Sequence, residues 1–222
     1  MASLRRIANC IGLPARFSLR GHFYGHLTRH RRPLSLLQQL RRLQGPHFHL
    51  NVIRVGSESF TDTEVASIDD ALQATRELYA TVGLGIGRVL QFYITTGKAN
   101  GHASIEGTGE ACDLTDEWTV PNDALDAFFV LTWPGTIGGW SPIGGSCDKE
   151  SKYGSGVVVD TGILWYNNTP LAHEIGHYLG LDHSDDPNNL MFEDGPTELG
   201  VLTRRQGATM RGHCLVKRGC RP

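Results

Sequence analysis

Three histidines and one glutamate stand at regular spacing in a short segment of the sequence, residues 171–184 (LAHEIGHYLGLDHS). His173 and His177 are four residues apart, so on a helix their side chains stack on one face and can present two ring nitrogens to one ion. Glu174 directly follows the first histidine, from where its carboxylate can reach a water molecule held by that ion. The spacing therefore predicts a helix that carries a metal site.

The residues that follow the helix complete this site. Gly180 can adopt a left-handed conformation and end the helix, which lets the chain turn and bring His183 back as a third ligand. Three neutral imidazoles leave the fourth tetrahedral position open for water, as in catalytic rather than structural zinc sites. The full pattern HExxHxxGxxH arises by chance about once in ten million positions. We therefore expect one catalytic Zn²⁺ on His173, His177 and His183, rather than a solvated His and Glu pair.

Residues 173–192, HEIGHYLGLDHSDDPNNLMF, resemble the zinc-binding consensus of the metzincin zinc metallopeptidases. They are most similar to the matrixin branch, which comprises the matrix metalloproteases and their bacterial relatives, and suggest a compact microbial-type member. The resemblance implies that Met191 lies in a turn beneath the three histidines and supports the site, together with Gly180. Astacins have a tyrosine ligand two residues after this methionine, and Glu193 at that place argues against the astacin branch.

The resemblance implies an endopeptidase that hydrolyses peptide bonds, with Glu174 as the general base that activates a water on the zinc ion. A protein or peptide substrate would bind extended, antiparallel to an edge strand near residues 137–143, and residues 192–202 would form a wall of the pocket. The alternative is a zinc-binding but catalytically silent peptide-binding module, for which the presence of Glu174 gives no support.

Calcium is a second ion to consider. The histidine-rich segment that binds a structural zinc and calcium in animal matrixins is not recognisable, and only His102 falls in the corresponding region. The candidate calcium ligands are scattered and lack the signature of a calcium loop: Asp113, Asp116, Asp148 and Asp160. The sequence therefore allows Ca²⁺ without predicting a site for it.

The elements that must position the site follow from hydrophobic periodicity. Strands are predicted at residues 47–55, 88–94, 124–133, 137–143 and 156–160, and a helix at residues 62–81 with Thr61 or Asp62 as its cap. Residues 95–122 are predicted to form a loop region. This order indicates an α/β (α+β) fold around a twisted sheet. The metzincin resemblance implies a mostly parallel sheet with an antiparallel edge strand, an active-site helix and a C-terminal helix at residues 203–214.

Other residues receive structural interpretations. Tyr178, Leu179 and Leu181 are predicted to pack in the core, whereas His47, His49 and His213 are predicted to lie on ordinary surfaces. Of the five cysteines, four allow three disulfide connectivities, and proximity along the chain favours the pairs Cys112–Cys147 and Cys214–Cys220. Reduced buried thiols are the alternative.

The distribution of charge divides the chain of 222 residues, whose formal net charge is −2. Residues 1–57 contain ten arginines and no acidic residue, so the remainder carries a net charge of −12. We expect a basic arm at residues 1–46 and a catalytic domain at residues 47–222. A transit peptide, a pro-segment, a basic tail and a start codon assigned too far upstream all remain options for the arm.

Composition also bears on partners. Ten arginines could tether the chain to nucleic acid or to an anionic membrane, but no aromatic-interleaved recognition module accompanies them, so we expect no specific nucleic-acid partner. No run of eighteen apolar residues occurs, so no transmembrane segment is expected. We expect a monomer. The compartment is open; secretion is favoured for the catalytic body, although no clear signal peptide is present.

Overall fold

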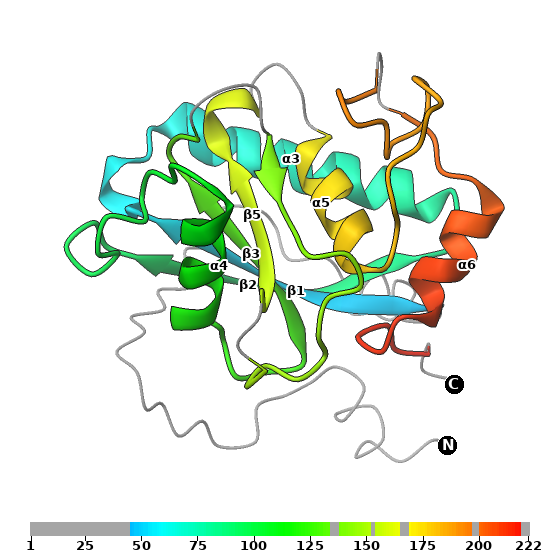
Figure 1. Ribbon diagram of the computed structural model, residues 1–222, viewed down its shortest axis with the longest axis horizontal. Helices are drawn as coiled ribbons and strands as arrows, with labels where there is room; N and C mark the ends of the chain where they lie inside the picture. Colours follow the sequence, from blue (N-terminus) through cyan, green and yellow to red (C-terminus); the bar gives the residue numbers. More distant parts are fainter. Residues whose placement is uncertain (1–44, 134–137, 152–153, 165–168, 197–199, 219–222) are drawn as a thin grey trace, which may run out of the picture.

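The computed structural model describes residues 45–133, 138–151, 154–164, 169–196 and 200–218 (Figure 1). Almost all of the predicted basic arm, including Cys10, lies outside these residues, as does Cys220. The division into an arm and a catalytic domain therefore stays a prediction.

A five-stranded sheet forms the centre of the molecule, in the order β2-β1-β3-β5-β4 (Figure 1). Its strands are β1 (His47–Val55), β2 (Gly85–Ile94), β3 (Ala124–Val130), β4 (Gly139–Trp140) and β5 (Gly156–Asp160). Neighbouring strands are parallel except β4, which pairs antiparallel with β5 at the edge. The predicted α/β fold with an antiparallel edge strand is confirmed.

Helices cover both faces of the sheet (Figure 1). The core on one face includes residues of α3 (Asp62–Ala80) and α5 (Pro170–Tyr178), and the core on the other face includes residues of α4 (Thr108–Glu117). A further helix, α6 (Arg204–Gly212), follows the active-site region, and two short 3₁₀ turns complete the described elements: η1 (Ser57–Ser59) and η2 (Thr161–Ile163). No helix among the described residues is long and apolar enough to cross a bilayer.

The central strand β3 shows why this sequence forms a three-layered structure. All seven of its residues are buried, as expected for a parallel strand covered on both faces. Alternate side chains enter opposite cores: Leu125 and Phe129 pack on the side of α3 and α5, whereas Phe128 and Val130 pack on the side of α4. The period of two in ALDAFFV thus joins both hydrophobic cores through one strand.

Helix α3 supports the helix that carries the site. It starts at a capping box in which the side chains and backbone of Thr61 and Glu64 bond reciprocally, so Thr61 is the cap. Near its other end, the fully buried Tyr79 donates a hydrogen bond from its hydroxyl to the backbone oxygen of Ala172, over 2.6 Å. Because Ala172 directly precedes the first histidine of the motif, α3 fixes the start of the helix that carries the motif.

Several predicted elements differ from the structure. The strands predicted at residues 124–133 and 137–143 are shorter, since β3 ends at Val130 and β4 comprises Gly139–Trp140. Residues 108–117 form α4 instead of continuing a loop, because Ala111, Leu114 and Thr115 supply a short buried face that is hard to detect among polar neighbours. Strand β2 begins three residues before the predicted start, at Gly85. Its first part is rich in glycine, which lowers strand propensity, yet pairing with β1 extends the ladder.

The predicted surface positions of His47 and His49 are also wrong, since the two residues are 1% and 2% exposed. A side chain at Gly87 would approach both rings to 2.8 Å, so this glycine of β2 provides the space that the two imidazoles fill. Burial, aided by the charge of Arg88, lowers the pKa of His49 to about 4. Both histidines are therefore structural residues of the sheet.

Candidate metal centre and active-site cleft

Helix α5 presents the first two histidines of the motif and ends in a turn that returns the third. Gly180 has φ 97°, a left-handed conformation that favours glycine. The backbone N–H of Gly180 bonds the carbonyl of His177 over 2.8 Å, and that of Leu181 bonds the carbonyl of Gly176 over 3.0 Å. These two bonds form a Schellman motif, as the glycine predicts, and the reversed chain carries His183 back to the helix.

The three histidine side chains converge through their Nε2 atoms. The Nε2 of His177 lies 3.0 Å from that of His173 and 3.1 Å from that of His183. On the other side of the rings, the Nδ1 of His173 lies 2.8 Å from the carbonyl of Leu190, and the Nδ1 of His177 lies 2.7 Å from the carbonyl of Leu181. Because a carbonyl only accepts, both Nδ1 atoms carry the proton, and both Nε2 atoms present bare lone pairs.

Facing lone pairs repel each other unless a cation lies between them, so this arrangement itself calls for a metal ion. A tetrahedral zinc with Zn–N bonds of 2.0–2.1 Å sets its ligand nitrogens about 3.3 Å apart, close to the observed spacing. Burial lowers the pKa of His173 to about 4 and lowers that of His177, so both rings are neutral and able to bind metal at neutral pH. The described residues fit a tetrahedral zinc ion.

Met191 lies directly against α5, at the place that the sequence predicts. It is fully buried, and a Cβ atom added at Gly176 would come within 2.6 Å of its sulfur. The turn is closed by a 2.8 Å hydrogen bond from the N–H of Ser184 to the carbonyl of Met191. Gly176, inside the motif but outside the ligand pattern, therefore lets the methionine turn approach the metal-site helix.

A pair of amides connects the methionine turn to α6. Asn189, which is 2% exposed, accepts a bond from the N–H of Met191 over 3.0 Å and exchanges two side-chain hydrogen bonds with Gln206. Gln206 also completes a capping box with Thr203 at the start of α6. Sequence reasoning missed this pair, although the T-x-x-Q spacing signals the capping box.

A cleft of about 720 Å³ opens in front of the histidines. The edge segment 138–141 lines one side of the cleft. Residues 193–196 line another side, in agreement with the predicted wall at residues 192–202. Residues 197–199 of that wall lie outside the described residues. Glu174 also lines the cleft but is only 7% exposed. Its burial raises the pKa of its carboxyl to about 8. The site thus combines three histidines that could hold a metal ion, a carboxyl group of raised pKa and space for a ligand.

Residues 96–196 match the family model of the matrixins, and this range includes Glu174 and the three histidines of the motif. Over these residues the chain is similar to the matrixins. Solved structures agree with this likeness in fold: metalloproteinase II from Bacteroides fragilis has a TM-score of 0.52 at 16% identity, over 92% of this chain and 60% of that one. The matrixin-like chain therefore spans well under the full length of that protein.

Two further solved structures are similar. A chaperone–substrate complex has a TM-score of 0.53 at 15% identity, over 78% of this chain and 35% of that one. Archaemetzincin from Methanopyrus kandleri has a TM-score of 0.48 at 16% identity, over 75% of this chain and 95% of that one. No curated protein sequence matches the chain. The likeness to metalloproteinase II and to the chaperone–substrate complex shows that the mixed α/β fold occurs in solved structures.

Gly139 of the edge strand controls the room around Glu174 in this matrixin-like site. A Cβ atom there would lie 2.5 Å from the carbonyl of Val158 and 2.8 Å from the Cγ of Glu174. We expect Gly139→Ala to destabilise the protein by about 1–3 kcal/mol and to displace Glu174. Denaturant unfolding measures the loss, with Gly109→Ala as the control, since a Cβ at Gly109 meets nothing within 4 Å. Equal stability of both variants would contradict this.

The metal-free matrixin-like protein should lose stability above pH 6.5. The folded-state pKa of Glu174, raised to about 8, lies above its ordinary value of 4.5, so the folded state binds the extra proton and stability falls as pH rises between these values. His173 is half-buried, and its pKa is lowered to about 4. Its titration increases stability as pH rises, but only up to its ordinary value of 6.5, so it does not offset the fall above that pH. The free energy of unfolding should therefore fall by about 2 kcal/mol from pH 6.5 to 8.

Urea unfolding of chelator-treated protein across this pH range measures that slope. Glu174→Gln cannot titrate and should remove the fall, while zinc, whose charge favours the carboxylate, should reduce it. A slope that is identical in the parent and in Glu174→Gln would assign it to other groups.

The calcium option gains no support from the structure. Among the described residues, two groups have three potential ligand atoms close together, and neither includes a carboxylate: the three motif histidines, and Cys147 with His213 and Cys214. Asp116, Asp148 and Asp160 instead accept hydrogen bonds from backbone N–H groups of nearby loops. These carboxylates are used to order loops.

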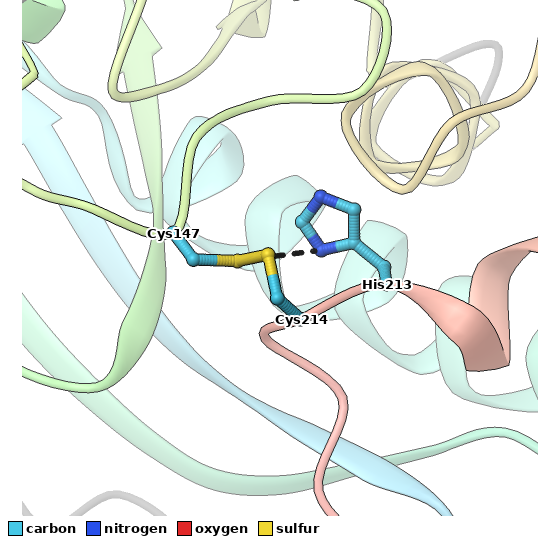
Figure 2. Close-up of side chains that lie close together, drawn as sticks. All are labelled: Cys147, His213 and Cys214. Carbon is cyan, nitrogen blue, oxygen red and sulfur yellow. Dashed lines mark hydrogen bonds between the residues drawn. A yellow bond between two sulfur atoms is a disulfide. The ribbon is translucent and has the colours of Figure 1, made fainter.

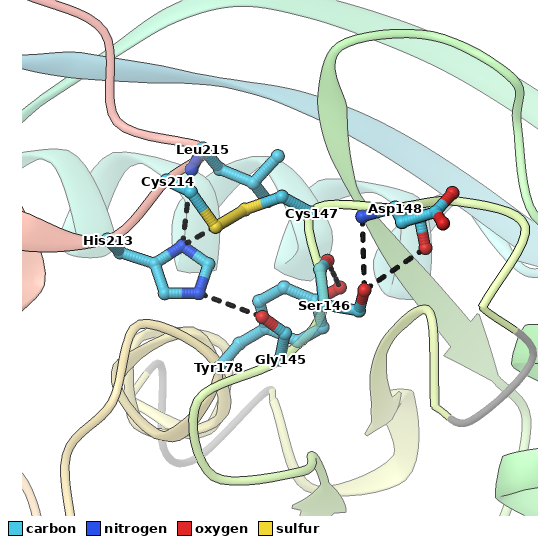
Figure 3. Close-up of a disulfide and its surroundings, with 8 residues drawn as sticks. All are labelled: Gly145, Ser146, Cys147, Asp148, Tyr178, His213, Cys214 and Leu215. Carbon is cyan, nitrogen blue, oxygen red and sulfur yellow. Dashed lines mark hydrogen bonds between the residues drawn. A yellow bond between two sulfur atoms is a disulfide. The ribbon is translucent and has the colours of Figure 1, made fainter.

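The favoured disulfide pairing is wrong. Cys147 is bonded to Cys214, 67 residues away, with a Cα–Cα distance of 6.1 Å, and Cys112 is a free thiol (Figure 3). Proximity along the chain failed because the loop after β4 meets the end of α6 in space. His213 lies beside this bond, half-buried against Tyr178, so its predicted position on an ordinary surface is also wrong.

Proposed function

We propose that this matrixin-like chain is a zinc-dependent metalloendopeptidase. The observation that carries the proposal is the convergence of three histidine Nε2 atoms within a cleft that Glu174 also lines. The matrixin match of residues 96–196 supports a zinc metallopeptidase at the level of the family. His173, His177 and His183 would hold the ion, and Gly180 and Met191 would support it from below.

Glu174 is the residue proposed to move protons. When bound, zinc would polarise the scissile carbonyl and lower the pKa of a bound water molecule. Glu174 would take the proton of the attacking water and then donate it to the leaving amine. Burial raises the proton affinity of its carboxyl, which suits a base, and the positive charge of a nearby ion would bring that pKa back toward neutrality.

An extended peptide is the proposed substrate. Strand β4 pairs with β5 through Gly139 and Trp140, and the same residues line the cleft. A peptide that lies antiparallel to β4 would add a strand to the sheet through main-chain hydrogen bonds. This places its scissile bond near the three histidines, and places a neighbouring side chain against the wall at residues 193–196.

A peptide assay with metal analysis tests the function. The purified full chain should contain one equivalent of zinc, cleave an internally quenched peptide library, lose activity with a chelator and regain it when zinc is returned. A silent peptide-binding module would instead contain the same zinc and bind peptides without any cleavage. Cleavage that survives complete removal of the metal would overturn the proposal.

The disulfide supports a proposal on location. Disulfides persist in oxidising compartments, and Cys147–Cys214 lies within the catalytic body. We propose that the body is secreted and acts as a monomer. Size-exclusion chromatography and thiol labelling of protein recovered from the growth medium and from cells measure both points.

A further inference from the structure

A second group of side chains with potential metal ligands lies away from the cleft, where the loop after β4 meets the end of α6 (Figure 2). It comprises Cys147, His213 and Cys214, whose potential ligand atoms all lie within 4.8 Å of one another. The Nδ1 of His213 is 4.0 Å from the Sγ of Cys147. Two sulfurs and one imidazole nitrogen are a donor set that suits a thiophilic ion such as zinc.

The orientation of His213 is set for this role. Its Nε2 lies 2.9 Å from the carbonyl of Gly145, so the proton is on Nε2 and Nδ1 carries the lone pair (Figure 3). This lone pair accepts a long hydrogen bond of 3.3 Å from the backbone N–H of Leu215, which a metal ion between Nδ1 and the sulfurs would replace. Such a hydrogen bond to a backbone carbonyl is the usual support behind a metal-binding histidine. The ring also packs edge-on against Tyr178, at 5.9 Å between centroids. The imidazole is therefore held in the tautomer that can bind metal.

We propose that the reduced form of this cluster, with Cys147 and Cys214 as thiolates and His213 as the third ligand, binds a zinc ion. The disulfide and the metal are then alternative states of one site. Reduction takes two electrons and two protons from a dithiol, which becomes a cyclic disulfide, and yields two protein thiols. Each thiol then loses its proton as its sulfur binds the ion.

The distances require little movement. In a tetrahedral zinc site two thiolates lie about 3.8 Å apart, and a sulfur and an imidazole nitrogen about 3.5 Å apart. The sulfurs must separate by about 2 Å once the bond between them is broken, while His213 already stands near its final distance from Cys147. Cys214 is exposed, so a reductant can reach the bond, and water can fill the fourth position.

Either state would link the same two segments. The loop that carries Cys147 also caps the C-terminal end of α5. The backbone N–H of Gly144 donates to the carbonyl of His177, and that of Gly145 donates to the carbonyl of Tyr178, each over 2.9 Å. A zinc ion in the reduced protein would therefore hold α6 to this loop before the disulfide forms. In an oxidising compartment a small-molecule disulfide would accept the two electrons of the thiolates and, with two protons, become two thiols. The Cys147–Cys214 bond would form in the same exchange and the zinc ion would be released.

Cobalt binding tests the proposal without relying on catalysis. The full chain with Cys10→Ser, Cys112→Ser and Cys220→Ser retains only the two cysteines of interest. After reduction with a dithiol and its removal under anaerobic conditions, this protein should bind two equivalents of Co²⁺ and show thiolate-to-cobalt charge transfer in the near ultraviolet. The oxidised protein should bind one equivalent, on the three motif histidines, without that band.

Variants decide whether the site is built as described. Adding Cys147→Ser and Cys214→Ser should abolish the band and the second equivalent, and His213→Ala should weaken Co²⁺ binding at least tenfold at this site alone. One equivalent and no charge transfer in the reduced protein would overturn the proposal. The proposal would also be overturned if His213→Ala showed the charge-transfer band with unchanged affinity for Co²⁺. This variant tests the site even if the double serine variant fails to fold. Loss of the motif-histidine equivalent alone would instead count against the proposed function.

Discussion

Replacing Glu174 with glutamine is expected to lower kcat/KM for peptide hydrolysis by about 10²- to 10⁴-fold. The amide has nearly the same shape as the carboxylate but cannot accept the proton of the attacking water. Because Glu174 is not among the three converging histidines, the variant should retain one equivalent of zinc. Steady-state kinetics with a quenched peptide, together with metal analysis of the same sample, measures both effects.

Glu193→Gln is the matched control for this experiment. It makes the same chemical change at another carboxylate that lines the cleft, but in the wall rather than beside the ligands. We expect it to alter kcat/KM much less than Glu174→Gln does. If the two variants lose activity equally, or if Glu174→Gln loses its zinc, then Glu174 does not act as the proposed base.

Removing the disulfide with Cys147→Ser and Cys214→Ser is expected to lower the free energy of unfolding by about 4 kcal/mol. The bond closes a loop of 67 residues, and the stabilisation from restricting the unfolded chain grows with loop length. Urea unfolding of oxidised, zinc-saturated protein and of the double variant measures the difference.

Cys112→Ser is the control for that measurement, because Cys112 carries a free thiol. It should change the unfolding free energy by much less than the double variant does. A double variant as stable as the parent would show that Cys147 and Cys214 are not joined in the folded protein. It would also remove the basis for treating the disulfide and the metal as alternative states.

The convergence of the three histidines was largely predictable from the sequence because its geometry is local. The ligands lie within eleven residues of one another, between His173 and His183, and helical spacing with one left-handed glycine is enough to bring them together. Strand β1 was predictable for a related reason, since its alternation of side chains is visible over nine residues.

Features that depend on contacts between distant segments were not predictable. Helix α4 is stabilised because Ala111 and Leu114 pack into the second hydrophobic core, on the face of the sheet opposite α3 and α5. The short, largely polar sequence of α4 does not indicate this packing. The disulfide depends on where a loop and the end of α6 meet in space. The burial of His49 depends on the missing side chain of Gly87 in the neighbouring strand.

The residues that pack beneath the cleft also include predictable and unpredictable features. The methionine turn could be expected from the family resemblance, but its link to α6 through Asn189 and Gln206 could not. Gly139 gives no sequence signal of its own, although its lack of a side chain makes room for Glu174. Each of these contacts joins segments that the periodicity of one element cannot relate.

The hydrogen bonds that orient His173 and His177 have a consequence for how the sequence can vary. His173 and His177 are oriented by the carbonyl oxygens of Leu190 and Leu181, which belong to the backbone rather than to side chains. Side-chain changes at those two positions therefore keep the acceptor in place as long as the turn keeps its shape. The backbone therefore sets the orientation of the two histidines. The side chains of Leu190 and Leu181 can change to fit the core without altering that orientation.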